Sequence, residues 1–250
     1  MKHARILRRP RLLVLTLLLV AAGTLSAQEF GGGISVFVPW DIFQGETGSI
    51  SFETSLETSL GLGDYLSIPV GFSYNQIYGM DASGTLSDTS SDPDSALETS
   101  GPWFYADSLL PYLLLKANVP LGPVYVDLYG GGALNYNFSL RPFTDRISRD
   151  LQETGAFGGS PGTAAITNIS IDSGIGWGWI AGAGFGVQID QIRVGLDVSY
   201  RYVVHPLTIT GDYVTSGGTG ITDFEADQYV DQLQAVLQGL SIGIGGSFSM

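Results

Sequence analysis

The chain has 250 residues, with 11 Lys and Arg against 24 Asp and Glu, a formal net charge of −13, and no cysteine. The excess of acidic residues excludes a nucleic-acid-binding protein, which needs a basic surface. The absence of cysteine excludes disulfides and thiolate metal sites. We therefore expect no nucleic-acid partner, and no motif in the chain calls for a cofactor.

Residues 1–27 have the organisation of a secretory signal peptide. Basic residues precede a short apolar stretch, residues 12–20, that is too short for a transmembrane helix. Ala27 is a small residue, so cleavage is expected before Gln28, with an uncleaved anchor as the alternative. Five of the 11 basic residues leave with this segment, and the remaining 6 basic and 24 acidic side chains give a net charge of −18. The rest of the chain has no run of about 18 apolar residues, so it could cross a membrane only as strands.

Most of the remaining chain alternates between apolar and polar or small residues with a period of two, which is typical of β-strands. The clearest segment is residues 49–61, where the apolar Phe52 precedes Glu53 on the opposite face. The same alternation is found, in chain order, in residues 34–38, 66–75, 124–138, 177–188, 192–202 and 240–250. Residues 105–116 are expected to form the remaining strand, although Pro111 there lacks a ladder donor.

The connections between these segments alternate in length. Short connections are expected at residues 61–64, 118–122 and 189–191, and long loops at residues 39–48, 79–101, 141–174 and 206–226. Three short turns and four long loops are what an eight-stranded up-and-down barrel with both ends on one side requires. A soluble sandwich, the alternative, has no reason to sort its loops in this way. We predict an all-β fold, a closed up-and-down antiparallel transmembrane β-barrel of about eight strands formed by residues 28–250.

Aromatic residues gather near the ends of the predicted strands, as they do at the two interfaces of a membrane. The residues expected to form a girdle at the long-loop end are Trp40, Trp103, Trp177, Trp179, Tyr200 and Tyr202. Phe30, Tyr65 and Phe248 lie near the opposite ends of their strands. The pattern favours two aromatic belts over the scattered aromatic residues of a soluble core.

The strand and loop pattern of residues 28–250, and the alternating apolar strand that ends in Phe248 and Met250, resemble the superfamily of small bacterial outer-membrane β-barrels, the OmpX/OmpW-like eight-stranded barrels. Members of these families tend to finish with a terminal aromatic residue that the insertion machinery reads. Here Met250 takes the last position and Gly246 interrupts the apolar row. The resemblance implies a place in the cell outer membrane, with outer-membrane lipid and the barrel-assembly machinery as partners. We expect a monomer.

Strand parity directs six charged residues into the barrel interior. These lumen-facing residues are Glu53, Glu57, Asp127, Arg193, Asp197 and Arg201. An eight-stranded barrel is only wide enough to be filled by its own side chains. We therefore expect an ion-pair network that fills the lumen, with a narrow polar path as the alternative.

Two acidic segments of the outer loops are candidate contacts for divalent cations, which prefer oxygen ligands. Their residues are Asp88, Asp92, Asp94 and Glu98 in one loop and Asp223, Glu225, Asp227 and Asp231 in another. The second segment fails the EF-hand pattern, so solvated surface charge is the expected state and no metal site is predicted. Residues 145–153 are spaced for a short helix with Ile147 and Leu151 on one face, whereas Val230 to Leu237 fits either a helix or the start of the last strand.

Three functions are compatible with these features. The favoured one is an integral membrane barrel with a structural or surface-interaction role. A narrow, porin-like conduit or binding protein for small hydrophobic molecules is the alternative that the resemblance to OmpW-like barrels implies. A lipid-modifying enzyme would need His205, the one histidine after residue 27, beside a hydroxyl group; Ser199 lies six residues away, so a structural role is expected for His205 and no enzyme is predicted.

Overall fold

The computed structural model describes residues 29–40, 42, 50–86, 96–97, 101–153, 164–215, 222–225 and 230–249. The predicted signal peptide, Met250 and the acidic residues 88–94 and 98 lie outside this range. Within it the chain is almost entirely antiparallel strand.

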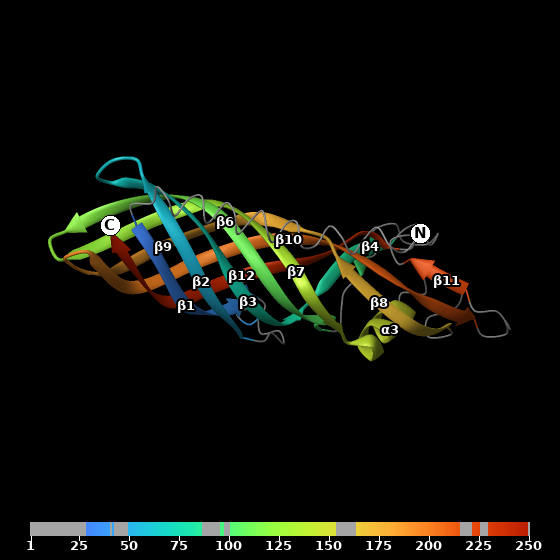
Figure 1. The fold of residues 1–250 in the computed structure, drawn as a ribbon. Coiled ribbons are helices and arrows are strands. Elements are labelled where there is room, and N and C mark those ends of the chain that lie inside the picture. Colours follow the sequence, from blue (N-terminus) through green and yellow to red (C-terminus); the bar gives the residue numbers. More distant parts are fainter. Residues whose placement is uncertain are drawn as a thin grey trace.

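Eight of the described strands form a closed ring (Figure 1). Their bounds are β1 Glu29–Pro39, β2 Ser51–Gly61, β3 Leu66–Met80, β6 Phe104–Leu121, β7 Val124–Pro142, β9 Gly176–Ile189, β10 Ile192–Thr215 and β12 Val230–Ser249. Each pairs with the next in this order, and β12 pairs with β1 to close the ring. The prediction of a closed up-and-down antiparallel barrel is confirmed.

The outer wall of this ring is apolar, and the inner wall carries the polar residues. On β2, Phe52 is 62% exposed, whereas Ser51 and Glu53 on the opposite face are buried. Leu113 of β6, Leu196 of β10 and other large apolar side chains on the outward positions are also more than half exposed. A wall of this kind is stable in hydrocarbon, where the closed ring leaves no backbone amide unpaired.

Pro111 is accommodated within the continuous strand β6. It lies opposite Phe72 of β3, and the register between β6 and β7 omits Leu110 and Pro111 while keeping the same phase on either side. The missing donor therefore interrupts one ladder without shifting it.

Beyond the part of the ring with the apolar outer wall, here called the apolar belt, the strands continue into an outer extension. The extension lies at the end opposite the short turns (Figure 1). The extension adds β4 Ala82–Leu86, β5 Ala96–Leu97, α3 Thr144–Glu153, β8 Ala164–Ser173 and β11 Thr222–Glu225. β4 pairs with β12, while β8 and β11 flank the upper part of β10.

Three of the segments expected to be long loops, residues 79–101, 141–174 and 206–226, therefore contain regular structure, and the prediction of loops was wrong there. β10 runs to Thr215 because Leu207 and Ile209 keep the alternation and bury their side chains in the extension. The predicted helix at residues 145–153 is present as α3, with Ile147 and Leu151 buried. Val230 to Leu237 belongs to β12 and not to a helix. Within the described residues no helix is long and apolar enough to cross a membrane.

Candidate functional site

The barrel interior changes in character along its axis, and β10 shows the change on a single face. Its inward positions begin with Arg193, Asp197 and Arg201, which line a cavity near the short turns. The next inward positions include Val203 and Leu207, which are buried in an apolar cluster. The lumen thus has a polar inner half and an apolar outer half.

The inner half contains a cavity of about 170 Å³. All six charged residues that parity directed inward line it: Glu53, Glu57, Asp127, Arg193, Asp197 and Arg201. A second cavity, of about 350 Å³, lies at the short turns and shares Lys116 and Arg193 with the first. The polar lumen is therefore hollow at the inner end.

Arg201 closes the polar half against the apolar half. Its Nη2 atom forms an ion pair with Glu53, and its Nη1 donates to Asn75 Oδ1 at 3.0 Å. Ser241 Oγ donates to the same Glu53 carboxylate at 3.1 Å. The guanidinium carbon lies 4.7 Å from the ring centroid of Phe37, the first residue of the apolar half on β1. Charge neutralisation and stacking together let a cation lie next to an apolar core.

Lys116 of β6 lies among three carboxylates of the cavity wall. The sequence analysis did not identify this residue. Its Nζ lies 3.8 Å from Glu29, 3.9 Å from Glu57 and 3.9 Å from Asp127. Asn118 Nδ2 also donates to Asp127, at 2.6 Å. The parity of β6 would have placed Lys116 inside, but Pro111 left the register of that strand open.

Tyrosine hydroxyl groups also donate to two of the carboxylates, those of Asp197 and Glu57. Tyr129 donates to Asp197 Oδ1 at 2.6 Å, and Tyr112 donates to Glu57 Oε2 at 3.2 Å. Arg193 lies over the ring of Tyr125, 5.2 Å from its centroid. These contacts fix the charged groups to the wall of the barrel around the cavity.

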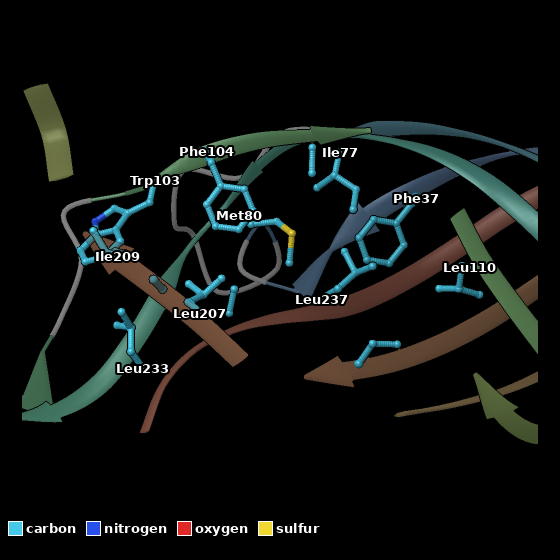
Figure 2. Packing of buried hydrophobic residues seen from close by; sticks show 14 of the residues in the cluster. Phe37, Ile77, Met80, Trp103, Phe104, Leu110, Leu207, Ile209, Leu233 and Leu237 are labelled. Carbon is cyan, nitrogen blue, oxygen red and sulfur yellow. The ribbon is translucent and has the colours of Figure 1, made fainter. Parts of the chain in front are cut away.

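The outer half of the lumen is filled by an apolar plug. Its members inside the barrel are Phe37, Ile77, Leu110, Leu114, Ala133, Ile180, Val203 and Leu237, which are at most 7% exposed. The cluster continues into the extension through Met80, Ala82, Trp103, Phe104, Ile147, Leu151, Leu207, Ile209 and Leu233. Figure 2 shows these side chains in succession, from Leu110 and Phe37 to Ile209 and Trp103.

Trp103 does not belong to the aromatic girdle, and its assignment there was wrong. It is 0% exposed, and its Nε1 donates to Asp150 of α3 at 2.6 Å. The helix, which lies more than forty residues further along the chain, folds over the indole and removes it from the membrane-facing wall.

Of the other predicted girdle residues, Trp177 and Trp179 are 68% and 47% exposed on β9. Tyr200 packs against both Trp179 and Trp40, with ring centroids 5.4 and 5.8 Å apart. Tyr202 is half-buried on the same face of β10 as Tyr200. Phe248 is 46% exposed on the wall near the short turns.

His205 lies inside the barrel on β10, between the buried residues Val203 and Leu207, and is 0% exposed. Its ring nitrogens lie 3.1 Å from Asn135 and 3.4 Å from Asn137. Ser173 accepts a hydrogen bond from Asn137 and donates its own proton to Gly174 O at 3.1 Å. The serine proton is directed away from the imidazole, so this group is a packed polar node and lacks the geometry of an activated nucleophile.

In the part of the chain that the structure describes, no group of three or more His, Cys, Asp or Glu side chains could hold a metal ion. Of the acidic loop residues, Asp223, Glu225 and Asp231 lie in β11 and β12, and the others lie outside the described residues.

No protein-family model matches the chain, and no curated protein matches it. Among solved structures the chain is similar to neisserial surface protein A (NspA), with a TM-score of 0.38 and 14% identity over 89% of this chain and 96% of that one. It is also similar to a major outer membrane protein from Thermus thermophilus, with a TM-score of 0.41 and 13% identity over 89% of this chain and 99% of that one. Both likenesses are weak, and neither transfers a function to this chain.

Proposed function

We propose that the chain is an integral outer-membrane barrel that conducts no solute and presents a folded extension at the outer surface, in a structural or surface-interaction role. The exposed apolar belt and the predicted signal peptide support the membrane location. The plug supports the absence of conduction.

The plug is the observation on which the proposal rests. Phe37, Leu110 and Val203 come from three different strands and are 0–1% exposed within the barrel. Interiors packed in this way contain few voids as large as a water molecule. The polar cavity therefore opens toward the short turns and ends at Arg201 and Phe37.

The same packing disfavours the hydrophobic conduit. A conduit needs an apolar pocket at the outer rim, lined by side chains that a ligand can reach. The large apolar side chains at that rim, Trp103, Phe104 and Ile209, are 0% exposed and belong to the plug. They contact one another and leave their surfaces unavailable to a ligand.

Single-channel recording in planar bilayers tests the proposal. The wild-type protein should show no conductance steps, whereas a Phe37→Ala/Leu110→Ala variant, which opens the plug, should show them. Leu113→Ala, an equivalent change on the lipid-facing wall where the side chain is 59% exposed, is the matched control and should remain silent. Steps from the wild-type protein, or silence from the plug variant, would contradict the proposed closure.

A further inference from the structure

The two cavities of the inner lumen contain more negative than positive side chains. Among the described residues, six carboxylates and three basic side chains line them. The carboxylates are those of Glu29, Glu53, Glu57, Asp64, Asp127 and Asp197, and the basic residues are Lys116, Arg193 and Arg201. The other basic residues after residue 28 are Arg141, Arg146 and Arg149, at the outer end of β7 and on α3. The chain therefore supplies no further cation to this part of the lumen.

Asp197 is an interior carboxylate without a basic partner. No Lys or Arg nitrogen of the described residues lies within 4.0 Å of it. Tyr129 donates a hydrogen bond to its Oδ1 at 2.6 Å, and no described residue donates to its Oδ2. A charge inside a protein is costly unless it is paired. Asp197 thus has room for a cation from outside the chain.

The free oxygen of Asp197 faces a gap over Gly184. In the register of the sheet, Gly184 of β9 lies directly between Asp127 of β7 and Asp197 of β10. A Cβ atom at Gly184 would lie 3.5 Å from the Cβ of Asp127 and 3.6 Å from Oδ2 of Asp197. These are ordinary van der Waals distances, so packing does not require a glycine here. The missing side chain leaves space for one atom beside the unpaired oxygen.

A second polar atom of the same cavity also lacks a partner. Arg201 is 2% exposed and lines the cavity, yet its Nε is buried without a hydrogen-bond acceptor among the described residues. Buried polar groups are nearly always hydrogen-bonded, either to the protein or to an enclosed molecule. The free donor of Arg201 and the free acceptor of Asp197 are independent signs that the cavity has a polar occupant.

The occupant that fits this wall is a small organic cation and not a metal ion. No group of three or more His, Cys, Asp or Glu side chains in the described part of the chain could hold a metal. At about 170 Å³, the cavity is many times larger than a single bound water requires. Leu114, Ile180 and the ring of Tyr125 also line it and can contact an alkyl group.

The route from the short turns does not repel a cation. Lys116 and Arg193 line both cavities, but Glu29 lies 3.8 Å from Lys116 Nζ and 3.9 Å from Arg193 Nη1. Asp64, exposed at the short turns, adds a second carboxylate to the outer cavity. The charges at the mouth therefore balance, and the excess of negative charge lies deeper.

We propose that the inner lumen binds a small primary amine that enters from the short turns, with its ammonium group over Gly184 and ion-paired with Asp197. A small shift toward Oδ2 brings the nitrogen to about 2.8 Å, the length of a charge-assisted hydrogen bond. Asp127 adds attraction from the other side of Gly184. The site lies in the hollow inner half of the lumen and does not depend on whether the outer half conducts.

Saturation-transfer difference NMR with n-propylamine tests the proposal. The protein is folded in a deuterated non-ionic detergent, because a charged headgroup would compete for the site. Propylammonium chloride is then titrated at constant ionic strength set by sodium chloride. The wild-type protein should transfer saturation to the propyl protons, and the signal should reach a plateau. Potassium and tetramethylammonium ions should not displace the amine, because neither offers an N–H donor to Asp197.

Two variants remove the site with little change to the wall. Asp197→Asn keeps the shape of the side chain and should weaken binding at least about tenfold, the loss expected for one charge-assisted hydrogen bond. Gly184→Ala should abolish binding, because its methyl group takes the place of the ammonium group. Gly245→Ala is the matched control, since it adds a methyl group to the same cavity where a Cβ would meet nothing closer than 3.4 Å. It should bind like the wild type, as should Asp64→Asn at the exposed turn.

The difference in gel mobility between boiled and unboiled samples shows that each variant is folded. Absence of saturation transfer to the amine in the wild-type protein would overturn the site. Equal binding by folded Gly184→Ala would place the amine elsewhere on this acidic protein and refute the assignment, as would unchanged affinity in Asp197→Asn. Displacement by potassium at the same concentration would show a general cation site and not an amine site. Each of these results would leave the proposed absence of conduction intact, because conductance is measured separately.

Discussion

Arg201 marks the level at which the interior of the barrel changes from polar to apolar. It is 2% exposed and satisfies its charge through Glu53 and the ring of Phe37. A buried ion pair adds little net stability compared with apolar residues, but removing one partner leaves an uncompensated buried charge.

We therefore expect Arg201→Met to destabilise the barrel by about 3 kcal/mol, because the Glu53 carboxylate loses its cation. The double variant Glu53→Gln/Arg201→Met should recover most of this loss. Equilibrium unfolding in urea, followed by tryptophan fluorescence in lipid vesicles, measures both. Equal destabilisation of the single and double variants would show that Arg201 acts through packing and not through charge.

The sequence predicts the inward-facing charges well wherever a strand is regular. Arg193, Asp197 and Arg201 are spaced by four on one strand, so they must face the same side, and all three line the cavity. Trp103 is not predictable in this way. Its indole donates a hydrogen bond to Asp150 of α3, and no local sequence pattern around Trp103 indicates that contact.

At the scale of elements, α3 is the part of the outer extension that packs onto the plug. Ile147 and Leu151 bury one face of the helix in the plug, and the hydrogen bond from Trp103 to Asp150 fixes its position. Phe143, directly before the helix, donates its amide to the carbonyl oxygen of Trp103 at 2.8 Å. The helix is therefore held by few but buried contacts.

Trp103→Phe should loosen α3 while leaving the ring of strands intact, because it removes a hydrogen bond to a buried carboxylate, a contact that contributes about 1.5–3 kcal/mol. Hydrogen–deuterium exchange should become faster in residues 144–153 and remain slow in β6 and β7. Trp179→Phe, on the outer wall, serves as the control and should leave exchange in α3 unchanged. Equally slow exchange in α3 of both variants would argue against this anchoring role.

The elements of the extension show the limit of prediction from a period of two. The alternation of β10 continues through Leu207 and Ile209, but beyond the aromatic belt it no longer distinguishes lipid from lumen. Residues 206–226 are rich in Gly, Thr and Asp, which are typical of turns. The strands form there because β8, β10 and α3 bury apolar residues against the top of the plug, a contact between segments far apart in the chain.

At the scale of the whole molecule, eight strands bond to one another in a closed ring whose exposed surface is apolar. A cylinder of this kind has no free sheet edge within the membrane. Local alternation and the sorting of connection lengths predict this architecture because each strand pairs with its neighbour in sequence. The plug was not predicted, because its side chains come together from strands that lie far apart in the chain.

The closed ring should resist dodecyl sulfate at room temperature. We expect the unboiled protein to migrate faster in a denaturing gel than the boiled protein, because the folded cylinder is more compact than the detergent-coated chain. The plug variant Phe37→Ala/Leu110→Ala should lose the fast form at a lower temperature, whereas Leu113→Ala should not. Identical mobility of the boiled and unboiled wild-type protein would contradict the barrel.

Pairing of β1 with β12 closes the ring, so folding cannot be complete before this pairing forms. Glu29 lies opposite Ser249 and Phe30 opposite Phe248, so the final ladder joins the two ends of the described chain. Contacts between residues so distant in sequence form slowly. Until β12 pairs, β1 and β10 each have an unpaired edge to which a strand of another chain can bind. A chain truncated before β12 would thus form an open sheet with two unpaired edges, which would be prone to aggregate. Pairing of β12 is therefore the step that completes the fold and removes this risk.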